Sequence, residues 1–391
     1  MDVVRAKNVL KRDNPSSVLL LASLIWPHLR ANFIAPMFTK ASAAPTEAEI
    51  LQALRAVRDP DLQKDIVALG FIKDLRICGA NVTFQIELTT PACPVKELMK
   101  SQAERAVMAV PGVTQVTVEM TARVTSSRPV LGEKGLIPGV KNVIAVSSGK
   151  GGVGKSTVAV NLACALARTG ANVGILDADV YGPNVPLMLG VRGQPLVQNK
   201  KIMPLTAHGL QVMSMALLVA DDQPVIWRGP MLHSAVRQFL YDVAWENLDY
   251  LVVDLPPGTG DAQLSLAQQA HIMGTVIVTT PQDVSVLDVK KAIRMFQTVN
   301  VPILGLVENM AWFTPPGSTE RYHLFGSGGG KKIEAEFGTP ILGQVPIEIA
   351  VREGGDNGKP IVLSNPDSAS GRAFIEIAGK VAQRISILNA E

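Results

Sequence analysis

A strand–loop–helix pattern in residues 142–157 restricts the possible folds of this chain more than any other stretch. Residues 142–147 are a short apolar run rich in β-branched side chains, which is typical of a buried parallel strand. A glycine-dense loop follows, and residues 156–167 have the pattern of a helix. The loop has the spacing G-x-x-x-x-G-K-S/T, formed by Gly149, Gly154, Lys155 and Ser156. This order of elements predicts an α/β domain that binds phosphate at the end of a strand.

The residue types in this loop suit a nucleoside triphosphate with Mg²⁺. Glycines allow successive backbone N–H groups to converge on the phosphates, and the following helix presents its N-terminal N–H groups to the same anion. Lys155 is expected to neutralise the β- and γ-phosphates, and the Ser156 hydroxyl to bind Mg²⁺. Nucleotide contacts are expected from Gly149, Lys150, Gly151, Gly152, Val153, Gly154, Lys155, Ser156 and Thr157.

A second lysine, Lys150, stands beside the first glycine of the loop. Because Lys155 and the backbone already enclose the nucleotide, the Lys150 ammonium is better placed to reach a phosphate bound by a neighbouring subunit. The segment resembles the deviant phosphate loop of the MinD/ParA/Mrp ATPases, in which such a lysine acts across a nucleotide-sandwich dimer. The resemblance implies a homodimer that hydrolyses ATP with Lys150 and Lys155 as catalytic residues. A charge supplied in this way accelerates phosphoryl transfer by about 10³ to 10⁵.

Length and composition describe a soluble chain with two domains. A chain of 391 residues is too long for one average domain. With 47% hydrophobic and 18% charged residues it has the composition of a well-packed protein rather than a disordered one. The net charge of +3 is too small to indicate nucleic-acid or membrane binding. Three scattered cysteines, Cys78, Cys93 and Cys164, form no disulfide framework and favour a reducing compartment.

Residues 1–45 carry six basic and two acidic side chains and are expected to be a disordered extension. Their longest apolar run, residues 18–26, is at most as long as a signal-peptide core, and no convincing small-residue cleavage site follows it. The segment is either an organellar transit peptide, which implies a stroma or matrix, or an upstream extension of the reading frame with Met37 rather than Met1 as the natural start. The second alternative is favoured, and it implies a cytoplasmic protein.

Residues 46–121 are expected to form a small α/β domain. An amphipathic helix begins after Thr46, and Glu49 completes a capping box with it. Two alternating runs joined by residues 78–80 predict a hairpin, and a further helix and strand follow. The motif T-T-P-A-C-P at residues 89–94 resembles the MIP18-type domain of iron–sulfur assembly factors.

Residues 122–140 are polar and lack periodicity, which predicts an interdomain linker. In residues 141–391 short apolar runs alternate with helical patterns. Such alternation predicts a mostly parallel sheet covered by helices on both faces, with ligands at the carboxyl ends of its strands. The predicted fold is therefore an α/β P-loop NTPase domain preceded by the smaller MIP18-like α/β domain.

Three carboxylates follow predicted strands of the larger domain. Asp177 and Asp179 stand at alternate positions at the end of an apolar run, so both are expected to face the phosphates. Asp254 ends a second apolar run and begins the stretch D-L-P-P-G-T-G-D, which resembles the Mrp/ApbC family. By this resemblance Asp179 positions the attacking water, whereas Asp177 and Asp254 lie on the Mg²⁺ side and act on the metal through water.

Asn309 lies in the stretch V-E-N-M, which closes another predicted strand. By resemblance to the same family its side chain contacts adenine. The guanine-reading pattern N-K-x-D is missing, because Asn199, Lys200 and Lys201 are followed by Ile202. ATP is therefore expected rather than GTP.

Together the two regions resemble iron–sulfur cluster carriers of the Mrp/ApbC type over about residues 46–385. The resemblance implies an ATPase homodimer that receives a cluster, expected to be 4Fe–4S, from scaffold proteins and passes it to apo iron–sulfur proteins. Many members carry C-x-x-C after the V-E-N-M stretch, but residues 311–318 contain no cysteine. Cys93 precedes a helix start, where a thiolate is favoured, and is the candidate ligand. Cys78, a partner or a small thiol would have to complete the set.

The alternative is a positioning ATPase of the MinD/ParA kind, which acts on membrane or DNA. Such a protein would need a basic amphipathic tail. Residues 374–385 have apolar side chains at helical spacing but only two bases, Lys380 and Arg384. The expected partners are therefore proteins, without nucleic acid or stable membrane association.

Overall fold

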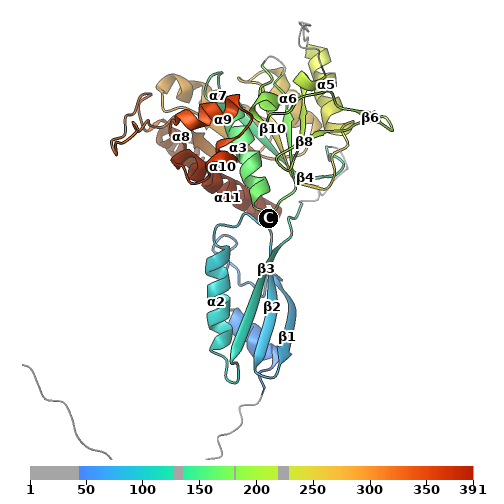
Figure 1. Ribbon diagram of the computed structural model, residues 1–391, viewed down its shortest axis with the longest axis vertical. Helices are drawn as coiled ribbons and strands as arrows, with labels where there is room; N and C mark the ends of the chain where they lie inside the picture. The colour runs from blue at the N-terminus through green and yellow to red at the C-terminus, as the bar shows by residue number, and fades with distance from the viewer. Residues whose placement is uncertain (1–43, 127–134, 180–181, 219–228, 391) are drawn as a thin grey trace, which may run out of the picture. The chain divides into compact units, whose positions relative to one another are not determined.

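Two β-sheets with separate hydrophobic cores organise the described part of the chain (Figure 1). The computed structural model describes residues 44–126, 135–179, 182–218 and 229–390. Almost all of the predicted extension, residues 1–43, and the middle of the predicted linker, residues 127–134, lie outside the described residues. The fold is therefore that of the unit from Ala44 onward.

The smaller sheet has three strands, β1 (Ile72–Cys78), β2 (Asn81–Leu88) and β3 (Gln115–Ala122). β1 and β2 form the predicted antiparallel hairpin, and β3 runs parallel to β2. The helices α1 (Glu47–Leu54) and α2 (Lys96–Met108) share a core with this sheet. Thr46 and Glu49 form the predicted capping box at the start of α1, with hydrogen bonds of 2.8 and 3.3 Å.

The larger sheet has eight strands in the order β13, β12, β11, β4, β10, β5, β9, β8. Their bounds in that order are Ile341–Gln344, Ile303–Glu308, Ile272–Thr279, Val140–Ser148, Leu248–Asp254, Val173–Asp177, Leu210–Ser214 and Leu205–Ala207. All neighbours pair in parallel except β8, which is antiparallel to β9. The prediction of a mostly parallel α/β sheet is confirmed.

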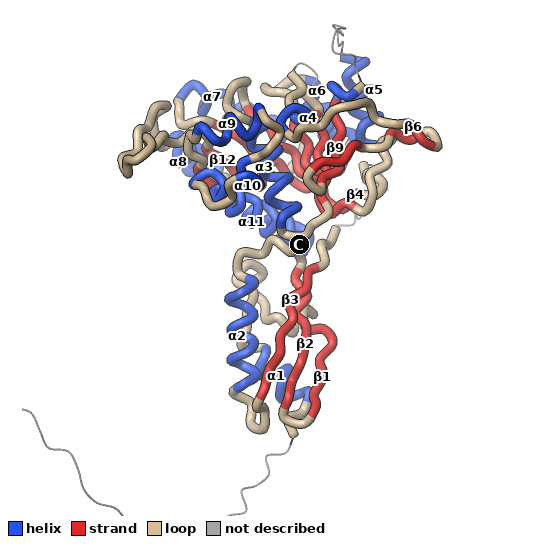
Figure 2. Tube along the Cα trace, viewed as in Figure 1, coloured by secondary structure: helices blue, strands red, loops and turns tan. Residues whose placement is uncertain are grey.

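Helices cover both faces of the larger sheet (Figure 2). One face packs against α3 (Lys155–Arg168), α10 (Ile361–Ser364) and α11 (Ala369–Ala390). The other packs against α5 (Gly229–Tyr241), α6 (Asp261–Gln269), α7 (Asp283–Thr298) and α8 (Gly329–Phe337). In β4, Ile144 and Val146 point to the first face and Val143 and Ala145 to the second, as the strand period of two requires.

Several short elements connect this frame. They are β6 (Val197–Gln198), β7 (Lys201–Ile202), a single 3₁₀ turn at Met215–Leu217, α4 (Val185–Met188) and α9 (Ile349–Asp356). No helix formed by the described residues is both long and apolar enough to span a membrane. The apolar face of α11, including Phe374 and Val381, is buried in the core instead of being presented to solvent.

Candidate functional site

The phosphate loop joins β4 to α3 and is shaped by close backbone contacts. Gly154 has a φ of 81° and precedes the first residue of α3, so it adopts the left-handed conformation that favours glycine. A Cβ atom at Gly154 would clash with Asn309 Nδ2, and one at Gly149 would clash with the backbone of Asp288 in α7. A side chain at Gly149 would displace the backbone of α7, and one at Gly154 would displace the Asn309 side chain.

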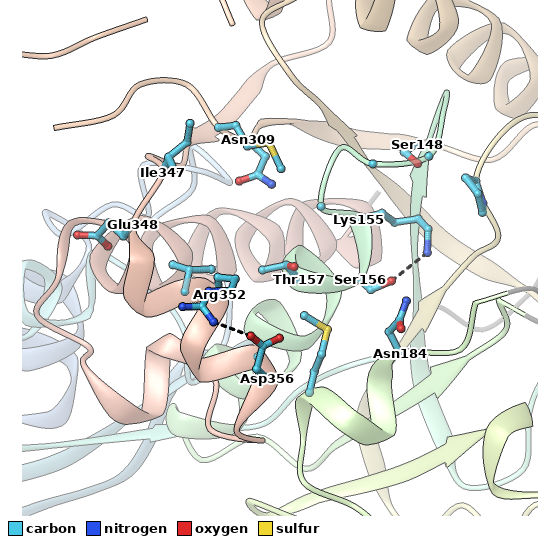
Figure 3. A pocket seen from close by; sticks show the side chains of 18 of the residues that line it. Ser148, Lys155, Ser156, Thr157, Asn184, Asn309, Ile347, Glu348, Arg352 and Asp356 are labelled. Atoms are coloured by element: carbon cyan, nitrogen blue, oxygen red, sulfur yellow. Dashed lines mark hydrogen bonds and ion pairs between the residues drawn. The ribbon is translucent and has the colours of Figure 1, made fainter. Parts of the chain in front are cut away.

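A cavity of about 740 Å³ lies beside this loop. Among the residues predicted to bind nucleotide it is lined by Lys150, Gly151, Gly152, Gly154, Lys155, Ser156, Thr157, Asp179 and Asn309. Gly149, Val153, Asp177 and Asp254 are not part of its lining. Figure 3 shows Lys155 and Ser156 at one end of the cavity and Ile347, Glu348 and Arg352 at the other.

Lys155 is a buried ammonium group held between two carboxylates. Its side chain is 6% exposed, and Nζ donates a 2.7 Å hydrogen bond to Asp254 Oδ1. Asp179 Oδ2 lies 3.7 Å from the same nitrogen. Because a buried charge is tolerated only when it is paired, this arrangement fixes the ammonium at the end of the cavity where phosphates would enter.

Asp254 has the properties expected of a carboxylate on the Mg²⁺ side. It is fully buried, and burial raises its pKa while the Lys155 charge lowers it. Its Oδ2 atom has no hydrogen-bond partner among the residues that the structure describes. A buried carboxylate beside the Ser156 hydroxyl, in the first turn of α3, suits a hard cation that prefers oxygen ligands. The residues present therefore fit Mg²⁺.

Asp177 is anchored in the protein by three donors. Its Oδ1 accepts from the Asp179 backbone N–H at 3.2 Å, and its Oδ2 accepts from the Val185 N–H at 3.2 Å and the Ser214 hydroxyl at 3.1 Å. Burial, followed by the charge of Asp254, raises the pKa of Asp177 to about 8. This carboxylate ties the end of β5 to α4 and β9, and its action on Mg²⁺ stays a prediction.

Asn309 lies at the end of β12 and contacts the phosphate loop directly. Its side-chain amide donates a 2.8 Å hydrogen bond to the Val153 carbonyl, and only 6% of the residue is exposed. The side chain also lines the cavity, on the wall that continues to Ile347. The amide N–H₂ thus braces the loop, and the predicted contact of Asn309 with adenine is untested.

Two short helices complete the cavity and were missed by the sequence analysis. α4 contributes Met188, and α9 contributes Val351 together with an exposed ion pair of 2.9 Å between Arg352 and Asp356. The sequence feature that could have indicated α9 is the helical spacing of the apolar residues Ile347 and Val351. Neighbouring Gly354 and Gly355 obscure that helical pattern, because glycine disfavours helix interiors.

Cys93, the predicted cluster ligand, lies in the loop between β2 and α2 and is half-buried. Burial raises the pKa of its thiol; the Val95 backbone N–H opposes this, while Asp59 and Asp61 add to it. Burial is the largest cause, so the pKa of Cys93 gives no support to the expectation that this loop favours the thiolate, and the role of Cys93 as a cluster ligand stays a prediction.

The other two cysteines lie far from this loop or inside the core. Cys78 is exposed at the turn of the hairpin, whereas Cys93 is grouped with Leu88 at the far end of β2. The eight residues of β2 span about 25 Å at 3.3 Å per residue, so one chain does not bring both sulfurs to one cluster. Burial raises the pKa of Cys164 to about 12, as expected for a packing residue. Within the described ranges no three His, Cys, Asp or Glu side chains form a group that could hold a metal ion.

Two protein-family models match separate segments of the chain. Residues 139–382 match the model described as "NUBPL iron-transfer P-loop NTPase", and residues 47–119 match the model described as "Iron-sulfur cluster assembly protein".

Relatives resemble the chain over most of its length. A Synechocystis protein named "Iron-sulfur cluster carrier protein" is 53% identical over 348 residues, which cover 88% of this chain and 98% of the relative. "Fe-S cluster assembly factor HCF101, chloroplastic" of Arabidopsis thaliana is 44% identical over 351 residues, which cover 88% of this chain and 64% of the relative. The solved nucleotide-binding protein of Archaeoglobus fulgidus in complex with ADP is 38% identical, with a TM-score of 0.53, and covers 60% of this chain and 92% of its own.

Proposed function

The chain belongs to the family of NUBPL iron-transfer P-loop NTPases, and from this premise we propose that it is an ATP-hydrolysing carrier of iron–sulfur clusters. In this proposal it acts as a homodimer that receives a cluster from a scaffold protein and transfers it to apo iron–sulfur proteins. The observation that carries the nucleotide part is the buried Lys155 ammonium between Asp254 and Asp179 at the end of a glycine-lined cavity.

The geometry supports a defined division of labour during hydrolysis. Lys155 and the N–H groups of the loop bind and orient the phosphates, and Asn309 keeps the loop in its shape through Val153. Ser156 and Asp254 would hold Mg²⁺, which supplies charge neutralisation on the phosphate oxygens when it is bound. Asp179 accepts a hydrogen bond from the attacking water and thereby orients it.

The proposed contribution of the second subunit is its Lys150 side chain. Lys150 lines the cavity and is partly exposed, whereas Lys155 is buried. A second copy would place its own Lys150 at the γ-phosphate of the first, and the added charge would stabilise the transition state. Hydrolysis would then require the dimer.

The cargo part of the proposal concerns Cys93. One thiol from each subunit supplies two of the ligands of a bridging cluster, and the separation of Cys78 from Cys93 leaves the others to a partner protein or a small thiol. An incomplete ligand set held by protein alone suits a carrier, because a labile cluster is passed on more readily than a fully ligated one.

An anaerobic assay tests both parts. The protein is reconstituted with iron and sulfide, its iron content and absorbance are measured, and transfer to an apo 4Fe–4S enzyme is followed with and without Mg-ATP. We expect cluster binding, ATP hydrolysis that depends on Lys150, and transfer at a rate that responds to ATP. Failure to bind any cluster would contradict the carrier function, and Lys150→Ala hydrolysing at the wild-type rate would contradict the dimer mechanism.

A further inference from the structure

A buried carboxylate at the end of β12 occupies the N-terminus of α8. Glu308 is 1% exposed, and its Oε2 accepts a 2.5 Å hydrogen bond from the Gly330 N–H in the first turn of that helix. Its Oε1 accepts a 2.6 Å hydrogen bond from the side-chain amide of Gln344 in β13. Both oxygens are therefore engaged, and neither points into the cavity.

The glycines at the start of α8 permit this contact. A Cβ atom at Gly329 would lie 2.5 Å from the Pro281 carbonyl oxygen, and one at Gly330 would lie 3.0 Å from Glu308 Oε2. The stretch G-S-G-G-G at residues 326–330 has the composition of a phosphate-binding turn. Its first-turn N–H is already used by a carboxylate of the same chain, which takes the place that an anion would occupy at a helix N-terminus.

The segment between Glu308 and α8 supports the wall of the nucleotide cavity. The Ala311 N–H donates to the Val345 carbonyl at 3.0 Å, and the Ile347 N–H donates to the Trp312 carbonyl at 2.7 Å. Leu324 and Phe325, which immediately precede the glycine stretch, line the cavity themselves. One end of this segment is hydrogen-bonded to residues 345–347, the other contributes side chains to the cavity lining, and Glu308 holds Gly330 where the chain enters α8.

Glu308 also precedes Asn309, the residue whose side chain hydrogen-bonds the phosphate loop. The next residue, Asn309, hydrogen-bonds the Val153 carbonyl through its side chain and the Thr279 carbonyl through its backbone N–H at 2.8 Å each. The last residue of β12 and the residue that follows it therefore contact the start of α8 and the phosphate loop, respectively.

From these contacts we propose that Glu308 is a positioning residue that sets nucleotide affinity. Its carboxylate holds residues 311–330 so that Ile347, Leu324 and Phe325 form a preorganised wall for the nucleotide. The inference rests on the proposed function, because it assumes that ATP occupies the cavity. Since Glu308 does not face the phosphates, its loss should change binding rather than the chemical step.

Three variants separate this role from a general loss of stability. Glu308→Ala leaves the Gly330 N–H and the Gln344 amide without partners, whereas Glu308→Gln retains an oxygen for Gly330 and can pair with a rotated Gln344 amide. Phe296→Leu, in α7, is the control, because Phe296 is fully buried away from the cavity lining. For each protein we would measure the melting temperature, the Kd for a non-hydrolysable ATP analogue, and kcat at saturating Mg-ATP.

We expect Glu308→Ala to raise the Kd about tenfold or more, with kcat within about twofold of wild type, and Glu308→Gln to stay within about threefold in both. Trp312 provides a second readout, because Arg321 stacks on its ring at 4.4 Å and the residue belongs to the positioned segment. Nucleotide binding is expected to change the tryptophan fluorescence, and comparison with Trp312→Phe identifies the part of this change that comes from Trp312. We expect that part to be absent in Glu308→Ala.

Unchanged affinity in Glu308→Ala would overturn the inference. An equal loss of nucleotide affinity in Glu308→Gln would also overturn it. The same holds for an equal loss of affinity in the Phe296→Leu control at the melting temperature of Glu308→Ala. A wild-type protein that binds no ATP analogue would overturn the proposed function, and this inference with it.

Discussion

The nucleotide end of the larger sheet and the Cys93 loop differ in how many parts of the chain define them. Lys155 is held by carboxylates from two other strand ends, and the loop around it is braced from β12 and contacted by α7. Cys93 is a single thiol with two carboxylates nearby, and Cys78 lies at the opposite end of β2. In the proposed mechanism the first site lacks only Lys150 of a second copy, whereas the second needs cluster ligands from other molecules.

A substitution in the core of the three-stranded sheet gives the strongest test of whether the Cys93 region and the nucleotide site are independent. Phe84 in β2 is fully buried in that core. Phe84→Ala should lower the free energy of unfolding of this region by about 3–5 kcal/mol, because it removes apolar contacts and leaves a cavity. Nucleotide affinity should change less than about twofold. The measurements are thermal unfolding and binding of an ATP analogue, and a parallel loss of affinity would show that the regions are coupled.

The completeness of the nucleotide site is tested by removing its central charge. Lys155→Ala should weaken ATP binding at least about 100-fold, or about 3 kcal/mol, since it deletes a charged hydrogen-bond donor to the phosphates. Calorimetry or fluorescent-nucleotide titration measures this. Lys141→Ala is a matched control: it removes a 2.7 Å ion pair with Asp249 that lies outside the cavity lining, and wild-type affinity is expected.

The incompleteness of the thiol site is tested by comparing single cysteine variants. Cys93→Ser should reduce the iron retained after anaerobic reconstitution by about tenfold or more, as expected for loss of a ligand. Cys78→Ser should retain wild-type iron content, because its sulfur lies at the opposite end of β2. Equal losses in both variants would indicate that the two cysteines share a cluster across subunits.

The environment of Cys93 makes a smaller, pH-dependent prediction. Because burial and the nearby carboxylates raise the pKa of this thiol, less thiolate is present at neutral pH than for an ordinary cysteine. Alkylation of Cys93 should therefore be slower in the native protein than in urea, with the difference narrowing as the pH rises through the raised pKa. Mass spectrometry of the alkylated peptide follows the rate, and faster native alkylation would contradict this account.

Features encoded by neighbouring residues were predictable from the sequence. The phosphate loop, the strand-end position of Asp254 and the capping box at Thr46 each depend on a local pattern, and the structure contains all three. The parallel sheet followed from the alternation of apolar runs and helical patterns.

Contacts between distant segments were not predictable in the same way. The hydrogen bond from Gly330 to Glu308 and the carboxylates facing Cys93 arise only when separate loops meet in the folded chain. Neither contact has a repeating pattern in the sequence. The helix α9 was not predicted because it is short and has two glycines in its last turn, although it contributes residues to the cavity lining.

The pairing of Lys155 with Asp254 and Asp179 implies that nucleotide capture is an exchange of anions. An incoming triphosphate competes with carboxylates that already satisfy the ammonium, so the affinity reflects the difference between two favourable contacts rather than one contact alone. In the proposed mechanism, the carboxylates released by this exchange would be free to help hold Mg²⁺. If hydrolysis proceeds as proposed, the same lysine would pair again with Asp254 and Asp179 once the product leaves.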